Sequence, residues 1–246
     1  MQKIIAPLLL GSLCAYAHFG LTMPSSNIVE EQKDSNIKIT YAFMHPFEQS
    51  YMKMEKPINA GVFSEGKLKK ITQDLKKEKE TWVSDFKIEK PAVFQFFVEP
   101  KPYFEPAEGK FIKHLTKSFV EGYGAGDGWD KAIGLKAEII PLTRPFGLYR
   151  GNLFQGKVLY KGKIVKNCEV EVEFYNDKGF KAPSDTHVTQ VVKTDENGIF
   201  SFTMPQSGWW GFAALIEDDL KLKHGDKKYP VELGAVLWVR ADEWKK

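Results

Sequence analysis

Short runs in which apolar and polar residues alternate recur along most of the chain. Such alternation is the pattern of strands that have one buried and one exposed face. Turn-forming residues separate the runs, as at residues 176–179 (NDKG) and 195–198 (DENG). The pattern therefore predicts an all-β fold. The predicted strands are NIKITYAFM, PAVFQFFVEP, GLKAEIIPL, FQGKVLYKGKIV, CEVEVEFYN, THVTQVVKTD, GIFSFTMP, GWWGFAALIED and ELGAVLWVRAD.

One charged stretch, KLKKITQDLKKEKE at residues 67–80, has a charge spacing that would suit a helix. It lacks the wide apolar stripe with which a helix packs on a core. Runs of like charge are also usually exposed to solvent. We therefore predict a solvated turn or strand pair here.

The segment from Pro141 to Pro145 looks like a domain boundary, because two prolines bracket residues that cannot continue a hydrogen-bonded ladder. After it, strands follow one another at about the 8–12 residue spacing typical of immunoglobulin-like sandwiches. We predict two β domains: residues 18–145 form an N-terminal β domain, and residues 146–246 form an immunoglobulin-like β-sandwich.

The first 17 residues have the features of a secretory signal peptide. A lysine precedes a short apolar run, and the run ends in Ala15-Tyr16-Ala17, an Ala-x-Ala cleavage signal. The alternative is a lipoprotein signal with Cys14 as the anchor, which Leu13 disfavours because a small residue should precede that cysteine. We predict cleavage after Ala17, a periplasmic mature protein, and no direct membrane insertion, because no later apolar run is long enough to span a bilayer.

Charge and cysteine content exclude some classes of partner and fold. The chain carries 35 basic and 32 acidic side chains, and removal of Lys3 with the signal peptide brings it closer to neutrality. Nothing in this balance favours nucleic acid or an anionic membrane as partner. Cys168 is the one cysteine left after cleavage, so no internal disulfide can form and the fold depends on its hydrophobic core. We expect Cys168 to be a small buried strand residue.

The candidate metal ligands are histidines scattered over the whole chain. His18, His45, His114, His187 and His224 form no compact motif, so their spacing by itself is a weak metal signal. If cleavage follows Ala17, however, His18 becomes the first residue and offers an α-amine as well as an imidazole. His45 precedes a proline, which favours an extended conformation.

Three methionines, Met44, Met52 and Met54, surround His45. Thioethers prefer copper(I), but methionine also fills irregular gaps in cores, and both interpretations stay open. Catalysis has less support. The chain has no GxSxG motif, and the Gly-rich EGYGAGDGWD lacks the Lys-Ser/Thr ending of a phosphate loop, so we predict that the protein is not an enzyme.

The chain resembles the secreted nickel- or cobalt-uptake accessory proteins, often called nickel-uptake transporter family proteins. The likeness spans nearly the whole mature chain. It rests on His18 after the signal, HPFE at 45–48, EPAEGKFIKHLTK at 105–117, GWDKAIGLKAEIIPLTRPFGLYRGNLFQGKVL at 128–159, APSDTHVTQVVKTDENGIFSFTMPQSGWWGFAAL at 182–215 and HGDKKYPVELGAVLWV at 224–239.

The resemblance implies a soluble all-β periplasmic protein that binds nickel or cobalt and helps deliver it to a membrane permease of the energy-coupling-factor class. It implies His18, His45, His114 and His187 as metal ligands. His224 lies in a more variable stretch, expected at a hairpin tip, and ranks lower. Nickel(II) and copper(II) favour nitrogen-rich tetragonal sites, to which a terminal histidine would contribute two nitrogens.

Other functions stay open on the sequence. One is a periplasmic copper carrier with an N-terminal histidine, which the methionines favour. A second is a structural or adhesion module without metal, since many immunoglobulin-like sandwiches have that role. A histidine-brace oxidase ranks third, because it needs only His18 and one further histidine.

Overall fold

The computed structural model describes residues 17–245, so the predicted signal peptide and the Cys14 alternative lie outside the described residues apart from Ala17. The prediction of an all-β protein is confirmed. Besides strands, the described residues contain three short 3-10 turns, η1 (Gln32–Asp34), η2 (Thr72–Asp74) and η3 (Asp185–His187). No helix in this part of the chain is long and apolar enough to cross a membrane.

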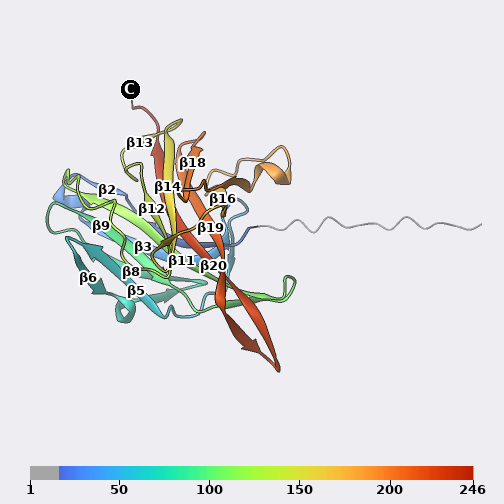
Figure 1. Ribbon diagram of the computed structural model, residues 1–246. Coiled ribbons are helices and arrows are strands. Elements are labelled where there is room, and N and C mark those ends of the chain that lie inside the picture. The colour runs from blue at the N-terminus through green and yellow to red at the C-terminus, as the bar shows by residue number, and fades with distance from the viewer. Residues whose placement is uncertain (1–16, 246) are drawn as a thin grey trace, which may run out of the picture.

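The strands form three sheets (Figure 1). We call the five-stranded one the N-terminal sheet; it contains β1 (Phe19–Pro24), β3 (Asn36–His45), β8 (Thr81–Lys87) and β7 (Lys76–Glu78) in that order, with β4 (Ser50–Met52) beside β3. The four-stranded C-terminal sheet contains β12 (Ala137–Pro141), β14 (Leu153–Tyr160), β15 (Lys163–Ile164) and β18 (Ile199–Thr203).

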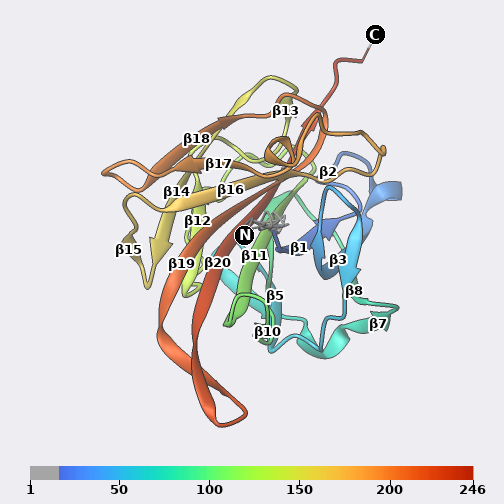
Figure 2. The same cartoon turned by 90° about the vertical axis from the view of Figure 1, so that its right-hand side faces the viewer.

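The central sheet has eleven strands, which come from both the N-terminal and the C-terminal half of the chain. Its order is β17 (Gln190–Lys193), β16 (Glu169–Phe174), β19 (Gly208–His224), β20 (Lys227–Asp242), β11 (Lys110–Gly122), β9 (Ala92–Glu99), β5 (Asn59–Ser64) and β6 (Lys67–Lys70). Three short strands pair outside this path, namely β2 (Ile28–Val29), β10 (Tyr103–Glu105) and β13 (Leu148–Tyr149). The β19–β20 hairpin extends well beyond its neighbours (Figure 2).

Both faces of the central sheet are covered. Successive strand residues point to opposite faces, and on β20 Leu237 packs with the C-terminal sheet while Trp238 packs with the N-terminal sheet. On β9, Phe94 and Phe96 also face the N-terminal sheet. The sheets therefore stack as layers, with sandwich-like packing on each side.

The predicted division into two domains near residue 145 is not confirmed. Strand β11, which precedes that point, pairs in parallel with β20, which follows it, from Phe111↔Val231 to Ser118↔Trp238. One continuous sheet thus takes strands from both predicted domains. Parallel pairing between strands more than a hundred residues apart leaves no local signal in the sequence.

Several local predictions are confirmed. The charged run at residues 67–80 forms β6, η2 and β7, with the lysines of both strands exposed. Cys168 is buried, one residue before β16, and burial raises the pKa of its thiol to about 11. His224 ends β19 at the tip of the long hairpin.

Candidate metal centre

His18 and His45 lie opposite each other because of strand register. The antiparallel pairing of β1 with β3 begins at Phe19↔Met44, which places the residue before Phe19 opposite the residue after Met44. The two imidazole rings have centroids 4.6 Å apart, tilted by 49°. Phe43, which lies on β3 with His45, stacks on His18, with ring centroids 5.4 Å apart. Residues 27 positions apart in the chain thus form one pair of imidazoles.

In the uncleaved chain, the Ala17 carbonyl fixes the tautomer of His45. Nδ1 of His45 lies 3.1 Å from the carbonyl oxygen of Ala17. A carbonyl oxygen can only accept a hydrogen bond, so the proton lies on Nδ1 and the lone pair of the neutral ring lies on Nε2. Histidines that bind metals commonly donate their other ring N–H to a carbonyl or carboxylate in this way.

Glu105 has the corresponding role for His18. Its Oε2 lies 3.4 Å from Nε2 of His18, and both side chains are largely buried. The carboxylate favours a proton on Nε2, which leaves the lone pair on Nδ1, the ring nitrogen nearer the backbone. Burial lowers the pKa of His18 below its ordinary value, and His45 lowers it further, against the opposing effect of Glu105. His18 is therefore neutral at pH 7 and able to act as a ligand.

His114 joins this cluster but presents a proton rather than a lone pair. It lies on β11 and contacts the edge of Phe43, with ring centroids 5.7 Å apart. The backbone N–H of Gly20 donates to its Nδ1 over 3.1 Å, so in the neutral ring the proton must lie on Nε2. Burial lowers the pKa of His114 to about 3, which keeps the ring neutral. In this orientation the ring has no lone pair to give to a metal.

His187 lies in a different environment. It ends η3, and its Nδ1 lies 2.8 Å from the hydroxyl of Ser184. It lines a separate cavity of about 390 Å³ together with Phe47 and Trp210. Among the contacts of the described residues, none joins it to His18, His45 or His114. His224 stacks on Phe104, with centroids 3.9 Å apart.

Two of the three methionines near His45 belong to the core rather than to the histidine cluster, and the third, Met52, is half-buried on β4 opposite Phe43. Met44 packs between the N-terminal and central sheets beside Phe19 and Trp238, and Met54 packs in a separate core cluster with Ile71 and Phe96. Within residues 17–245, no group of three or more His, Cys, Asp or Glu side chains is arranged to hold a metal ion. The adjacent imidazoles of His18 and His45 are therefore the part of a ligand set that side chains provide.

Glu105 and Tyr103, which border this cluster, were missed by the sequence interpretation. Both lie on β10, which pairs with β11 through Tyr103↔Ile112 and Glu105↔Lys110. The segment EPAEGKFIKH offered a signal, because a four-residue turn between two short extended runs predicts a hairpin. Such a hairpin brings a carboxylate to the edge of the strand that bears His114.

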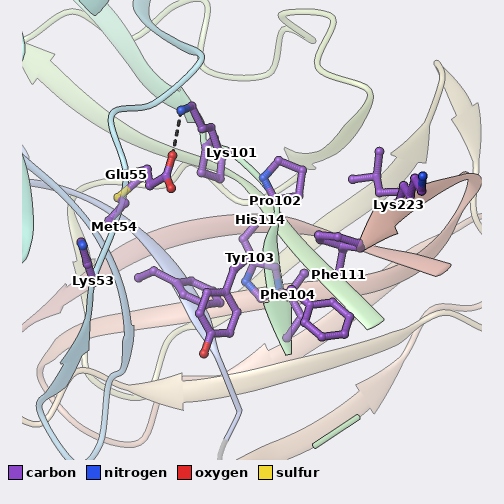
Figure 3. A pocket seen from close by; sticks show the side chains of 14 residues that line it. Lys53, Met54, Glu55, Lys101, Pro102, Tyr103, Phe104, Phe111, His114 and Lys223 are labelled. Atoms are coloured by element: carbon purple, nitrogen blue, oxygen red, sulfur yellow. Dashed lines mark hydrogen bonds and ion pairs between the residues drawn. The ribbon is translucent and has the colours of Figure 1, made fainter. Parts of the chain in front are cut away.

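A cavity of about 570 Å³ opens beside His114. Aromatic side chains form much of its wall, and His114 lies among Tyr103, Phe104 and Phe111 (Figure 3). Lys53, Lys101 and Lys223 lie around its periphery (Figure 3). Since Phe43 and Tyr103 contact His18 and also line the cavity, the cavity and the histidine pair share a wall.

Comparison with known proteins gives one family match. The model of a domain of unknown function (DUF4198) matches residues 15–218. No curated protein matches the chain significantly.

Solved structures with some likeness include the D0-D1 domain of intimin, which is 12% identical and aligns over 92% of this chain and 100% of that chain with a TM-score of 0.25. The adhesin InvE of Yersinia pseudotuberculosis is 11% identical over 87% of this chain and 58% of that chain, with a TM-score of 0.26. The fibronectin(III)-like modules of Clostridium thermocellum CbhA are 9% identical over 92% and 99%, with a TM-score of 0.22. TM-scores of this size support no inference about function.

Proposed function

The chain belongs to the DUF4198 family of domains of unknown function, and we propose from its own geometry that it binds a divalent transition metal ion. The metal is nickel, with cobalt as the close alternative, and its ligands are nitrogens of His18 and His45. The observation that carries the proposal is the pair of imidazoles 4.6 Å apart, with Nε2 of His18 beside the Glu105 carboxylate. The Ala17 carbonyl beside Nδ1 of His45 belongs to the uncleaved chain and leaves with the signal peptide.

The α-amine of His18 supplies a third nitrogen once the Ala17–His18 bond is cut. The carbonyl oxygen of Ala17 lies 3.1 Å from Nδ1 of His45. Standard peptide dimensions put the following nitrogen about 2.2 Å from that oxygen, and therefore within about 5.4 Å of the same Nδ1. Cleavage would thus create an amine beside both imidazoles. Before cleavage that nitrogen is an amide and cannot serve as a neutral donor.

Three nitrogens of this kind suit nickel(II) and copper(II), which favour tetragonal nitrogen-rich coordination. Glu105 would hold the ring of His18 in place from outside the ligand set, in the manner of carboxylates that orient metal-bound histidines. His114 as oriented does not fit as a ligand, and His187 lies at another cavity. We therefore propose a smaller site than the four histidines of the sequence prediction.

The proposed role is that of a carrier outside the cytoplasmic membrane that delivers the metal to a permease of the energy-coupling-factor class. Imidazole ligands support release as well as binding, because protons compete with the metal near the pKa of histidine. The metal is cargo in this role, and we propose no catalytic step. We also keep as a proposal that residues 146–246 form an immunoglobulin-like sandwich, which the packing of β14 and β18 on the central sheet supports.

A copper carrier is the second candidate. Copper(II) exceeds nickel(II) in affinity at most nitrogen sites, and the site has the same three nitrogens for either ion. Burial of Met44 and Met54 in two separate core clusters leaves the half-buried Met52 as the one thioether of the three that still favours copper(I). A structural or adhesion module without metal would show no such binding.

Anaerobic titration of the metal-free mature protein with nickel, cobalt, copper and zinc tests the proposal. Three forms are compared: protein that starts at His18, protein with one extra N-terminal residue, and the His18→Ala variant with a free amine. We expect nickel to bind the first form at least about tenfold more tightly than the second, or about 1.4 kcal/mol, and the third to bind more weakly still. Equal affinities in all three would refute the terminal ligand.

A further inference from the structure

Next to the histidine pair, the buried Nε2–H donor of His114 has no acceptor among the described residues. His114 is 2% exposed, and its Nε2 has no hydrogen-bond partner among the described residues. The Gly20 N–H occupies Nδ1, so Nε2 carries a proton. Leaving a buried donor unsatisfied costs about 1–3 kcal/mol. A ligand that placed a hydrogen-bond acceptor beside Nε2 would remove this cost.

Two glycines hold the ring in this place. A Cβ on Gly234 would lie 2.7 Å from both Cγ and Nε2 of His114, and one on Gly20 would lie 2.8 Å from its Cβ. Real Cβ atoms do not approach other atoms so closely. The imidazole therefore lies flat against β20 at a position where any other residue would push it away. This packing fixes the direction of the N–H without giving it an acceptor.

The cavity that His114 lines has the size and composition of a small-molecule site. Its volume is about 570 Å³, within the range usual for ligand pockets. Phe43, Tyr103, Phe104 and Phe111 provide an aromatic wall. His114 is the one buried polar side chain among the residues that line this cavity, and a largely apolar wall with one such donor favours a small, largely apolar molecule that carries one hydrogen-bond acceptor.

Charge at the rim indicates an anionic acceptor. The exposed side chains of Lys53, Lys101 and Lys223 line the opening, against the single carboxylate of Glu55. Lys101 pairs with Glu55 at 2.7 Å, whereas Lys53 and Lys223 take part in no ion pair among residues 17–245. The rim thus keeps an excess of positive charge, which attracts anions and repels cations.

We propose that this cavity binds a small organic carboxylate with an aromatic or branched apolar body. Nε2–H of His114 donates to one carboxylate oxygen, the aromatic wall covers the body, and Lys53 and Lys223 attract the charge. This binding is independent of the metal and does not rest on the carrier role. Because the cavity and the His18–His45 pair share Phe43 and Tyr103, a bound carboxylate would lie next to the metal site.

The test uses the metal-free mature protein with benzoate and benzamide, which have the same ring and differ in charge. We expect benzoate to bind at least tenfold more tightly than benzamide in calorimetric or NMR titrations. With ¹⁵N-labelled histidine, benzoate should shift the Nε2–H signal of His114, and a crystal soaked with benzoate should show it in this cavity.

Variants distinguish binding of benzoate in this cavity from a general attraction of benzoate to positive surface charge. His114→Phe keeps an aromatic ring and removes the donor, and should weaken benzoate binding at least fivefold. Should that variant fail to fold, K53Q/K223Q serves instead, because both lysines are exposed; it should weaken binding at least threefold. The matched control is K67Q/K69Q on β6, whose side chains are also exposed, and it should leave the affinity unchanged.

Three outcomes would overturn the proposal. One is equal affinity for benzoate and benzamide. A second is an Nε2–H signal that benzoate does not move, which would mean that the donor is met by water only. The third is benzoate found in the cavity beside His187 and not in that beside His114.

Discussion

The surroundings of His45 and of His187 differ in ways that the sequence does not show. Each histidine is the last residue of a secondary-structure element, and the resemblance to metal-uptake proteins implied both as ligands. His45 ends a long strand, faces His18 and donates to the Ala17 carbonyl. His187 ends a three-residue turn and contacts Ser184. The comparison teaches that pairing of neighbouring strands, rather than residue type, brings imidazoles together.

Glu173 on β16 connects the two regions. Its carboxylate accepts hydrogen bonds from the hydroxyl of Thr189, which follows the His187 turn, and from the backbone of Phe47, which follows His45. It is 1% exposed, and its Oε2 has no partner among the described residues. Burial raises its pKa to about 8, with Glu48 and Glu171 adding to the rise. A protonated carboxyl therefore holds the two loops at neutral pH.

The largest expected effect is on stability and concerns this connection. In the folded protein Glu173 has a pKa of about 8 and keeps its proton up to that pH, whereas in the unfolded chain it loses the proton near the ordinary glutamate pKa of 4.5. Its contribution is complete below pH 4.5 and is lost as the pH rises toward 8. Glu173→Gln mimics the protonated form and should be more stable than wild type by roughly 3 kcal/mol at pH 7, at 1.36 kcal/mol per pKa unit.

Urea unfolding from pH 5 to pH 8.5 measures this difference, which should grow with pH. The control is Glu169→Gln, two positions before Glu171 on the same strand, at a site where the side chain is 57% exposed. Its stability relative to wild type should not depend on pH. A Glu173→Gln variant whose advantage stays constant across this range would show that the carboxyl is ionised in the fold.

The second prediction contrasts the two histidines directly. His45→Ala removes a proposed ligand and should weaken nickel binding by about a hundredfold, or about 2.7 kcal/mol. His187→Ala should change the affinity less than about twofold, because its ring lines another cavity. Calorimetric titration of both mature variants measures this. If the two lose affinity equally, the four-histidine set of the sequence prediction is the better description.

The third prediction concerns the packing that presents His114. Gly234→Ala places a methyl group against the imidazole, and overpacking of a tight core costs about 1–3 kcal/mol. We expect a loss of about 2 kcal/mol in urea unfolding. Gly225→Ala, at the exposed hairpin tip where a Cβ meets nothing within 4 Å, controls for loss of glycine itself, although its positive φ of 59° adds some strain. A Gly234→Ala protein as stable as wild type would mean that the ring moves away freely.

The smallest expected effect concerns Glu105. Glu105→Gln removes the charge that orients His18 and should lower nickel affinity about tenfold, the lower end for residues that support metal ligands. Glu108→Gln is the matched control, since Glu108 pairs with Lys110 rather than contacting His18, and it should change affinity less than about threefold. Titration of both variants distinguishes a positioning carboxylate from a general acidic environment.

Much of the fold could be predicted from local pattern. Short runs rich in branched and aromatic residues, many of them alternating with polar ones, predicted β3, β9, β16 and β19, and the lack of an apolar stripe predicted a solvated turn or strand pair at residues 67–80. The predicted division into two domains near residue 145 is not confirmed, because β11, which precedes that point, pairs in parallel with β20, which follows it. For the site, His18 and His45 could be named as candidates. The β10–β11 hairpin had a local signal, but the position of Glu105 beside His18 depends on packing between distant segments.

The sequence by itself determined the β class of this protein, the burial of Cys168, the position of His224 at a hairpin tip and the set of candidate histidines. Each of these follows from residue types within a few positions, where periodicity and turn chemistry act. Only the tertiary structure decided which histidines meet and which nitrogen each one presents. Gly20 N–H assigns a proton to Nε2 of His114, and the Ala17 carbonyl assigns one to Nδ1 of His45. A tautomer depends on the hydrogen-bond partner of the ring, and that partner comes from strand register, which no local pattern fixes.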